Sequence, residues 1–208
     1  ITVDRGVAHR IAGLWFAALP ARPASWDEVD AGLRRLAGGV GLVAVEVRGA
    51  RPARVVHALD PDVPRAVGSA FKLYVLGALA RAVARGDARW DEPLANRAAR
   101  RSLPSGQMGD QPAGRRLPLR RYAEQMIAVS DNTAADHLIR RLGRDAVERA
   151  LAGLGMRDPE RTTPFLTTRE MVVLKLTPAL TRAWSRADAA GRRRLLRAVD
   201  RRPLPAER

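Results

Sequence analysis

The spacing of apolar and polar residues separates a short strand-rich stretch from a long helical one. Runs rich in β-branched residues over 41–47 and 54–59 predict two strands, and the Gly- and Pro-containing stretch between them predicts a hairpin. Before them, Ser25 and Glu28 have the spacing of a capping box. This predicts a helix of about ten residues that ends near Gly38.

After residue 60 the apolar positions recur at the three-to-four-residue spacing of amphipathic helices. The predicted helices cover residues 69–84, 118–129, 133–142, 144–154, 167–176, 179–187 and 192–199. Residues 100–117 interrupt them with prolines and glycines at turn spacing, and a loop of this length is often functional. A single hairpin rarely makes a stable sheet, so we expect further strands to lie beyond Arg208 or to come from a partner.

The first residues carry no clear periodic pattern. Pro20 and Pro23 lie in Ala-rich surroundings that are typical of a linker. We therefore expect residues 1–24 to be the tail of a preceding domain or a linker. Residues 25–208 are expected to form the main domain, which is C-terminally incomplete.

The composition describes a globular chain with a strongly basic surface. The 208 residues include 37 Lys and Arg against 22 Asp and Glu, a net charge of +15. Such charge can indicate nucleic-acid binding, but the arginines are spread along the chain and aromatic residues make up only 4% of it. We expect no nucleic-acid partner. The chain has no cysteine, which excludes disulfides and thiolate chemistry, and no apolar run long enough to span a membrane.

Lysine is rare in this basic chain. Only Lys72 and Lys175 occur among the 37 basic residues, so a generic positive charge is almost always supplied by arginine. A buried lysine can lose its proton and act as a base, whereas arginine is effectively never deprotonated. A lysine retained in this background is therefore a candidate for acid–base chemistry.

Ser69 and Lys72 open the most apolar predicted helix, three residues apart and on one helical face. A serine at a helix start faces free N–H groups and the positive end of the helix dipole, and the lysine amine can reach its hydroxyl. Burial against Phe71, Leu73, Tyr74 and Leu76 would lower the pKa of the lysine and activate the serine as a nucleophile. The alternative is a serine helix cap beside a lysine that reaches solvent.

Ser130, Asp131 and Asn132 stand together at the break between two predicted helices. Each of these residue types is a good helix cap, and capping accounts for one of them. It does not account for all three, in this order, after a separate Ser-x-x-Lys. By contrast, His9, His57 and His137 are too widely spaced for a metal pattern, and no glycine-rich phosphate loop occurs, so we expect neither a metal nor a cofactor.

The two motifs resemble the first two signatures of the class A serine β-lactamases and penicillin-binding proteins. The resemblance covers roughly residues 25–176. It implies an α/β fold of α+β type, with a helical block packed on an antiparallel sheet that is incomplete in this chain. It also implies hydrolysis of a small β-lactam through an acyl-enzyme, and an extracytoplasmic location by analogy with the family.

The resemblance assigns roles to individual residues. Ser69 would be the nucleophile, its backbone N–H would be an oxyanion donor, and Lys72 would be its base or electrostatic activator. Ser130 would relay a proton to the leaving nitrogen, and Asn132 would bind the substrate's side-chain amide and hold the lysine. Thr133 and Asp136 are interpreted as helix-start residues.

Two parts of the family pattern are missing. No Lys-Thr-Gly sequence follows Ser130, which agrees with a chain cut before the strand that normally carries it. The loop over residues 156–164 is short, and Glu160 is the only candidate in it for a deacylating base, although an exposed loop glutamate is usually just solvated. Glu170 is better explained as the capping-box partner of Thr167. Three functions stay open: a β-lactamase, an esterase or penicillin-binding-type acyl enzyme with slow deacylation, and a non-catalytic module.

Overall fold

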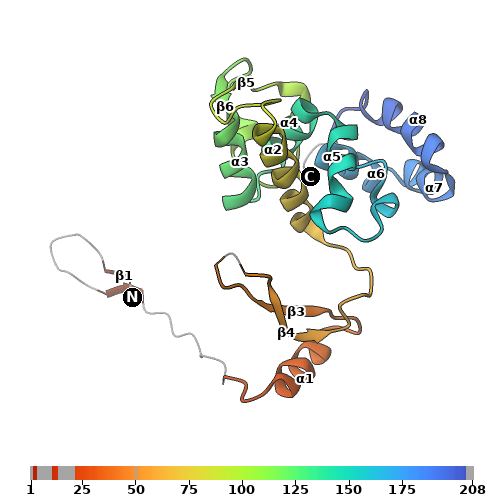
Figure 1. Cartoon of the computed structure of the whole chain (residues 1–208). Coiled ribbons are helices and arrows are strands. Elements are labelled where there is room, and N and C mark those ends of the chain that lie inside the picture. The colour runs from red at the N-terminus through yellow and green to blue at the C-terminus, as the bar shows by residue number, and fades with distance from the viewer. Residues whose placement is uncertain (1, 4–10, 14–21, 50, 205–208) are drawn as a thin grey trace. The chain divides into compact units, whose positions relative to one another are not determined.

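The computed structural model describes residues 2–3, 11–13, 22–49 and 51–204 (Figure 1). The chain divides into two compact units, residues 1–66 and residues 67–208. Most of residues 1–24 lie outside the described ranges, so their assignment to a preceding domain or linker stays a prediction.

The strands of the first unit form antiparallel pairs. β1 (Thr2–Val3) pairs with β2 (Ile11–Gly13), and β3 (Leu42–Glu46) pairs with β4 (Arg54–Leu59). The second pair is the predicted hairpin. Its register places the first residue of β3 opposite the last residue of β4, with one irregularity in the middle.

The helix of the first unit, α1 (Trp26–Leu36), begins and ends close to the predicted positions. The Ser25 side chain accepts the Glu28 N–H at 3.3 Å, as in a capping box. The Glu28 carboxylate reaches one residue further back and accepts the Ala24 N–H at 2.7 Å. Both contacts satisfy backbone donors that a helix start would otherwise leave free.

One face of the β3–β4 hairpin contacts α1. The His57 ring stacks on Trp26 with centroids 4.5 Å apart, and its Nε2 lies 2.8 Å from Asp30 Oδ1. Neighbouring side chains along a strand point to opposite faces. Val43 and Val45 therefore lie on the other face, where they are 47% and 44% exposed.

The second unit is a block of α-helices (Figure 1). Its helices are α2 (Lys72–Ala84), α3 (Leu119–Ala128), α4 (Asn132–Leu142), α5 (Arg144–Leu151), α6 (Thr168–Lys175), α7 (Pro178–Arg186) and α8 (Ala189–Val199). Each helix predicted from the apolar spacing is present, with ends shifted by up to a turn. Two predicted helices are partly 3-10: residues Gly68–Phe71 precede α2, and Ala152–Leu154 follow α5.

Two apolar clusters hold the helices together. The larger lies among α2, α3, α4 and α5, and its fully buried members include Val75, Leu79, Tyr122, Met126 and Leu138. α2 lies between α3 and α5 in this block (Figure 1). The smaller cluster joins α6 to α8 through Val173, Leu174, Leu196 and Val199, and α7 packs against it with Leu180 and Trp184. Burial of apolar side chains of this size supplies most of the stability of such a block.

A short ladder closes the irregular loop. β5 (Pro93–Ala95) pairs antiparallel with β6 (Arg116–Pro118), so the chain between them leaves and returns at one place. Inside the loop, the buried Asn96 amide donates to the carbonyl oxygens of Met108 and Gln111 at 3.2 and 2.8 Å. The prediction that residues 100–117 are wholly irregular is therefore wrong for the last residues of this range, which belong to β6. The strand was not predicted because three residues that include a proline are too few to show an alternating pattern.

The described residues are mainly helical with small antiparallel sheets, which confirms the α+β class. Across those residues, no helix has the length and apolar character needed to cross a membrane.

Candidate functional site

Ser69 and Lys72 are positioned by the 3-10 turn that leads into α2. Gly68 opens this turn with φ of +50°, a region that favours glycine. A 3-10 helix has three residues per turn, so side chains three apart stand directly above one another. The Ser69 Oγ lies 3.3 Å from the Lys72 Nζ. The serine is exposed, and the lysine beneath it is 2% exposed.

The Ser130–Asn132 turn links α3 to α4. Ser130 has φ of +58°, which is uncommon for a residue with a side chain. Asp131 is the N-cap of α4, and its Oδ1 accepts the Ala134 N–H at 2.7 Å. Helix capping thus explains Asp131. The residues on either side of it, Ser130 and Asn132, make a different contact.

That contact is the amine of Lys72. Its Nζ lies 2.5 Å from the Ser130 carbonyl oxygen, 2.9 Å from Ser130 Oγ and 2.7 Å from Asn132 Oδ1. Together with the Ser69 Oγ, this brings three residues of the two motifs to the Lys72 amine. The structure therefore assembles Ser69, Lys72, Ser130 and Asn132 as a single cluster.

Burial lowers the pKa of Lys72, and the nearby charges of Asp131 and Asp136 act in the opposite direction. The Phe71 ring lies 5.8 Å from the Nζ. Leu73 is 60% exposed, so the prediction that it helps to bury Lys72 is wrong. Because burial outweighs the two carboxylates, the neutral amine is more accessible at neutral pH than for an ordinary lysine.

The irregular loop supports the turn from the other side. The Ser105 Oγ donates to the Ser130 carbonyl at 2.7 Å, and the Ser105 carbonyl accepts the Asn132 N–H at 3.1 Å. The Asn132 Nδ2 donates to the Leu103 carbonyl at 2.8 Å. The length of this loop indicated a functional segment, but the sequence did not identify Ser105. A single serine in a Pro- and Gly-rich loop has no neighbouring residue pattern that marks it.

Asp131 fastens the same loop. Its Oδ2 accepts the Met108 N–H at 2.8 Å, and its side chain is fully buried. Gly106 passes close by with φ of +101°, and a Cβ at this position would stand 2.0 Å from the Asp131 Oδ2. Only glycine allows both the backbone angle and the approach.

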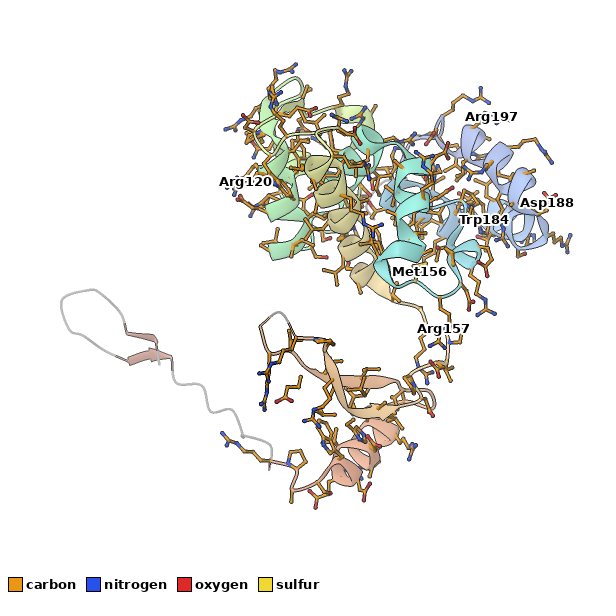
Figure 2. The ribbon with its side chains drawn as sticks, viewed as in Figure 1. Arg120, Met156, Arg157, Trp184, Asp188 and Arg197 are labelled. Carbon is orange, nitrogen blue, oxygen red and sulfur yellow. The ribbon has the colours of Figure 1, made fainter. Side chains whose placement is uncertain are left out.

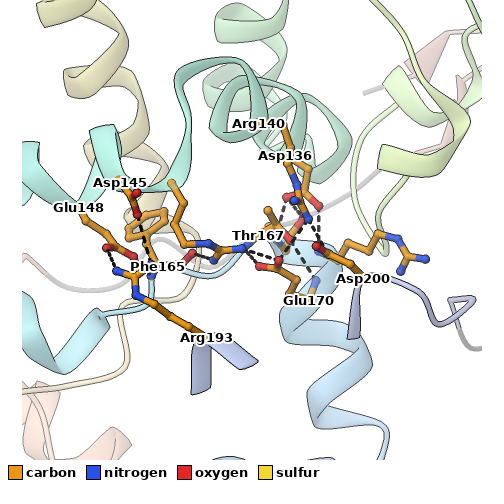
Figure 3. Close-up of polar contacts among 12 residues, drawn as sticks. Asp136, Arg140, Asp145, Glu148, Phe165, Thr167, Glu170, Arg193 and Asp200 are labelled. Carbon is orange, nitrogen blue, oxygen red and sulfur yellow. Dashed lines mark hydrogen bonds and ion pairs between the residues drawn. The ribbon is translucent and has the colours of Figure 1, made fainter. Parts of the chain in front are cut away.

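Asp136 connects α4 to the start of α6 (Figure 3). Its Oδ1 accepts the Thr168 N–H at 2.7 Å and the Thr168 hydroxyl at 2.8 Å, and its Oδ2 accepts the Arg169 N–H at 2.9 Å. The Thr168 Oγ1 also lies 3.2 Å from the Asn132 carbonyl oxygen. Burial raises the pKa of Asp136 to about 7. Asp136 was expected at the start of a helix. It lies within α4, and its carboxylate caps the start of α6.

Glu170 is the capping-box partner of Thr167, as predicted. Its Oε2 accepts the Thr167 N–H at 2.7 Å. The carboxylate is fully buried, and its Oε1 lies 2.5 Å from an Arg144 nitrogen and 3.2 Å from an Arg140 nitrogen. Glu170 is thus a structural residue that anchors α6 to α4 and α5.

Glu160 lies in the short 3-10 helix Pro159–Thr162 and is exposed; this helix follows Met156 and Arg157 in the chain (Figure 2). None of the side-chain contacts among the described residues joins it to Ser69 or Lys72. Its role as a general base therefore stays a prediction.

His137 is a structural histidine. A backbone N–H can only donate, so the 2.9 Å contact from the Arg97 N–H requires an unprotonated Nε2. The Nδ1 then donates to the Thr133 carbonyl at 2.7 Å. Burial lowers the pKa of His137, which favours this neutral form. Over the described part of the chain, no group of three or more His, Asp or Glu side chains is placed to hold a metal ion.

A helical block with a small antiparallel sheet, and two Ser-containing motifs joined at one buried lysine, define the fold class of the serine β-lactamases and transpeptidases. The model of the β-lactamase enzyme family matches residues 29–198. The chain belongs to this family, which confirms the resemblance drawn from its motifs. No curated protein sequence matches the chain.

Solved structures agree on the fold. A β-lactamase from Sphaerobacter thermophilus is 30% identical and superposes with a TM-score of 0.53, over 64% of this chain and 50% of that one. An ancestral class A β-lactamase is 24% identical with a TM-score of 0.53, over 83% of this chain and 70% of that one. A point mutant of PBP-A, solved as an acyl-enzyme complex with penicillin-G, is 22% identical with a TM-score of 0.52, over 86% and 70%. The chain thus spans half the length of the Sphaerobacter enzyme.

Proposed function

We propose that this chain carries the acylation site of a serine hydrolase that opens β-lactam rings through an acyl-enzyme on Ser69. The observation that carries the proposal is the buried Lys72 amine, which lies 3.3 Å from the Ser69 hydroxyl and 2.9 Å from the Ser130 hydroxyl. Family membership supports a hydrolase of this kind. The β-lactam substrate and the role of each residue are part of the proposal.

The contacts of Lys72 are compatible with a neutral amine as well as with an ammonium. The Ser130 carbonyl and the Asn132 Oδ1 can only accept, so each takes one N–H from the amine. A neutral amine has two N–H bonds and one lone pair, and the lone pair is left for a hydroxyl. The depressed pKa of Lys72 makes this form accessible, as a general base requires.

In the proposed reaction the Ser69 Oγ forms a bond to the lactam carbonyl carbon while its proton passes to the Lys72 nitrogen. The ring C–N bond then breaks as the Ser130 hydroxyl gives its proton to the leaving nitrogen and takes one from the Lys72 amine in return. The negative charge that develops on the carbonyl oxygen is stabilised by the Ser69 backbone N–H. Proton and electron pair are balanced without any further reactant.

Asn132 is placed to hold the lysine and the substrate together. Its Oδ1 accepts from Lys72, and one Nδ2 hydrogen goes to the Leu103 carbonyl. An amide nitrogen has a second hydrogen. We assign this hydrogen to the side-chain amide carbonyl of the substrate.

A slow-deacylating enzyme is the second candidate. Its support is that Glu160 is exposed and that none of the described side-chain contacts joins it to Ser69 or Lys72, because hydrolysis of the acyl-enzyme ester needs a base that activates water at that bond. In this case the acyl-enzyme accumulates, as in a penicillin-binding protein or a slow esterase.

The test is intact-mass analysis after incubation with benzylpenicillin and, separately, with a small activated ester. Wild type is compared with Ser69→Ala and with Ser185→Ala, a matched variant of an exposed serine in α7. The proposal expects a gain of one penicillin in wild type and in Ser185→Ala, and none in Ser69→Ala. Decay of the adduct with time that slows in Glu160→Gln supports that glutamate as the deacylating base.

Other outcomes separate the alternatives. A stable adduct favours the slow acyl enzyme, and an adduct formed only with the ester favours an esterase. The absence of any adduct contradicts the proposal for this chain and favours a non-catalytic module. An adduct that persists in Ser69→Ala would show that another residue is the nucleophile.

A further inference from the structure

A cavity of about 290 Å³ lies beside the contact between α4 and α6, and none of its lining residues belongs to the Ser69–Lys72 cluster. Its charged lining residues are Arg100, Arg140, Arg169, Asp136 and Asp200. They come from a 3-10 helix at Ala98–Arg100, from α4, from the start of α6 and from the end of α8. Segments far apart in sequence therefore bring three arginines to the lining of one cavity.

The positive charges of this cavity are only partly neutralised. Arg140 is paired with Asp200 at 2.5 Å and with the buried Glu170 at 3.2 Å. Among the described contacts, the Arg100 guanidinium has no ion pair and no hydrogen bond. The Arg169 Nη2 donates to the Arg202 carbonyl, and its Nη1 is buried without a partner. Two of the arginines that line the cavity thus have no carboxylate partner among the residues that the structure describes.

The electrostatic environment of Arg100 also indicates an excess of positive charge at the cavity. The pKa of Arg100 is lowered by burial and by the neighbouring charges of Arg97 and Arg140. Asp136 compensates only in part, because burial raises its pKa to about 7 and the carboxyl is partly protonated at neutral pH. Its oxygens are also already occupied by donors from the first turn of α6.

We propose that this cavity binds a small oxyanion of the phosphate class through the guanidinium groups of Arg100 and Arg169. Guanidinium groups form paired hydrogen bonds with phosphate oxygens. A rotation of the Arg169 guanidinium would give its Nη1 the acceptor that it lacks, since an unmade hydrogen bond at a buried charged group is costly. The inference is independent of the proposed hydrolase activity.

The size of the cavity allows two sources for this anion. At about 30 Å³ for each water, the cavity holds roughly ten waters. It therefore accommodates either inorganic phosphate with its waters or the phosphate of a small phosphomonoester. Glycerol phosphate is a suitable probe for the second source.

The test is isothermal titration of the whole chain with inorganic phosphate and, separately, with glycerol phosphate, at neutral pH and constant ionic strength in chloride. We expect saturable binding with one site per chain. Loss of one charge-assisted contact weakens binding by about tenfold or more, so Arg100→Gln should raise the dissociation constant by at least that factor. Arg100→Lys, which keeps the charge but loses the paired geometry, should lie between the two. Arg194→Gln, an exposed arginine of α8, is the matched control and should bind as wild type does.

Three results would overturn the proposal. The first is that neither probe shows saturable binding, and the second is that Arg100→Gln binds with the affinity of wild type. The third is binding that survives Arg100→Gln but is lost in Lys72→Gln, which would place the anion at the lysine. Tighter binding of glycerol phosphate supports the cavity with a phosphomonoester as its ligand. Tighter binding of phosphate supports the free ion.

Discussion

Replacing Gly106 with alanine tests whether the irregular loop holds the Ser130–Asn132 turn in place. The backbone angle of +101° costs roughly 1–3 kcal/mol for a residue with a side chain. The new Cβ would stand 2.0 Å from the Asp131 Oδ2 and 2.5 Å from the Asp131 Cβ, so the aspartate and the loop must move apart and the bond to the Met108 N–H is lost. Loss of this charge-assisted bond costs about 1.5–3 kcal/mol. The two effects together lower the free energy of unfolding by roughly 2.5–6 kcal/mol.

Gly114→Ala separates the two effects. Gly114 lies in the same loop with φ of +84°, and no atom lies within 4 Å of the position that a Cβ would take. This variant has only the backbone cost, so Gly106→Ala should lose about 1.5–3 kcal/mol more in urea unfolding. Acylation by penicillin should slow in Gly106→Ala alone, because Asn132 follows Asp131 and contacts Lys72. Equal losses of stability in the two variants would refute the role given to the Asp131 contact.

Two further predictions concern proton transfer and pH. Lys72→Arg should slow adduct formation by roughly 10²–10⁴-fold, because arginine does not release its proton. Lys175→Arg, at the other lysine, which is exposed, should leave the rate unchanged. Equal rates in the two variants would contradict the general-base role of Lys72. The folded state holds the Asp136 proton up to about pH 7, while the unfolded chain loses it near 3.8, so this group lowers the free energy of unfolding as the pH rises between these values, by up to roughly 4 kcal/mol. Asp136→Asn has no such proton, so urea unfolding at about pH 5 and about pH 8 should show a smaller loss with rising pH than in wild type, and an unchanged difference would contradict the raised pKa.

The local elements of this protein were predictable because their signals are local. Ser25 and Glu28 predicted the start of α1, and Thr167 and Glu170 predicted the start of α6, since a cap involves residues only three positions apart. The β5–β6 ladder was missed, because each strand is three residues long and is stabilised by a partner about twenty positions away. Short segments of this kind carry no period.

The sequence by itself determined the chemistry of the candidate site. Two lysines in a basic chain, a serine three residues before one of them, and the Ser130–Asn132 tripeptide identified the cluster, because residue types and short spacings limit what the side chains can do. Only the tertiary structure decided which groups meet. It supplied Ser105 as a support of the turn, made Asp136 a cap of α6, and gave Glu160 no described side-chain contact with Ser69. It also brought Arg100 and Arg169 to one cavity, because contacts between distant segments depend on how the helices pack, and no local pattern records that packing.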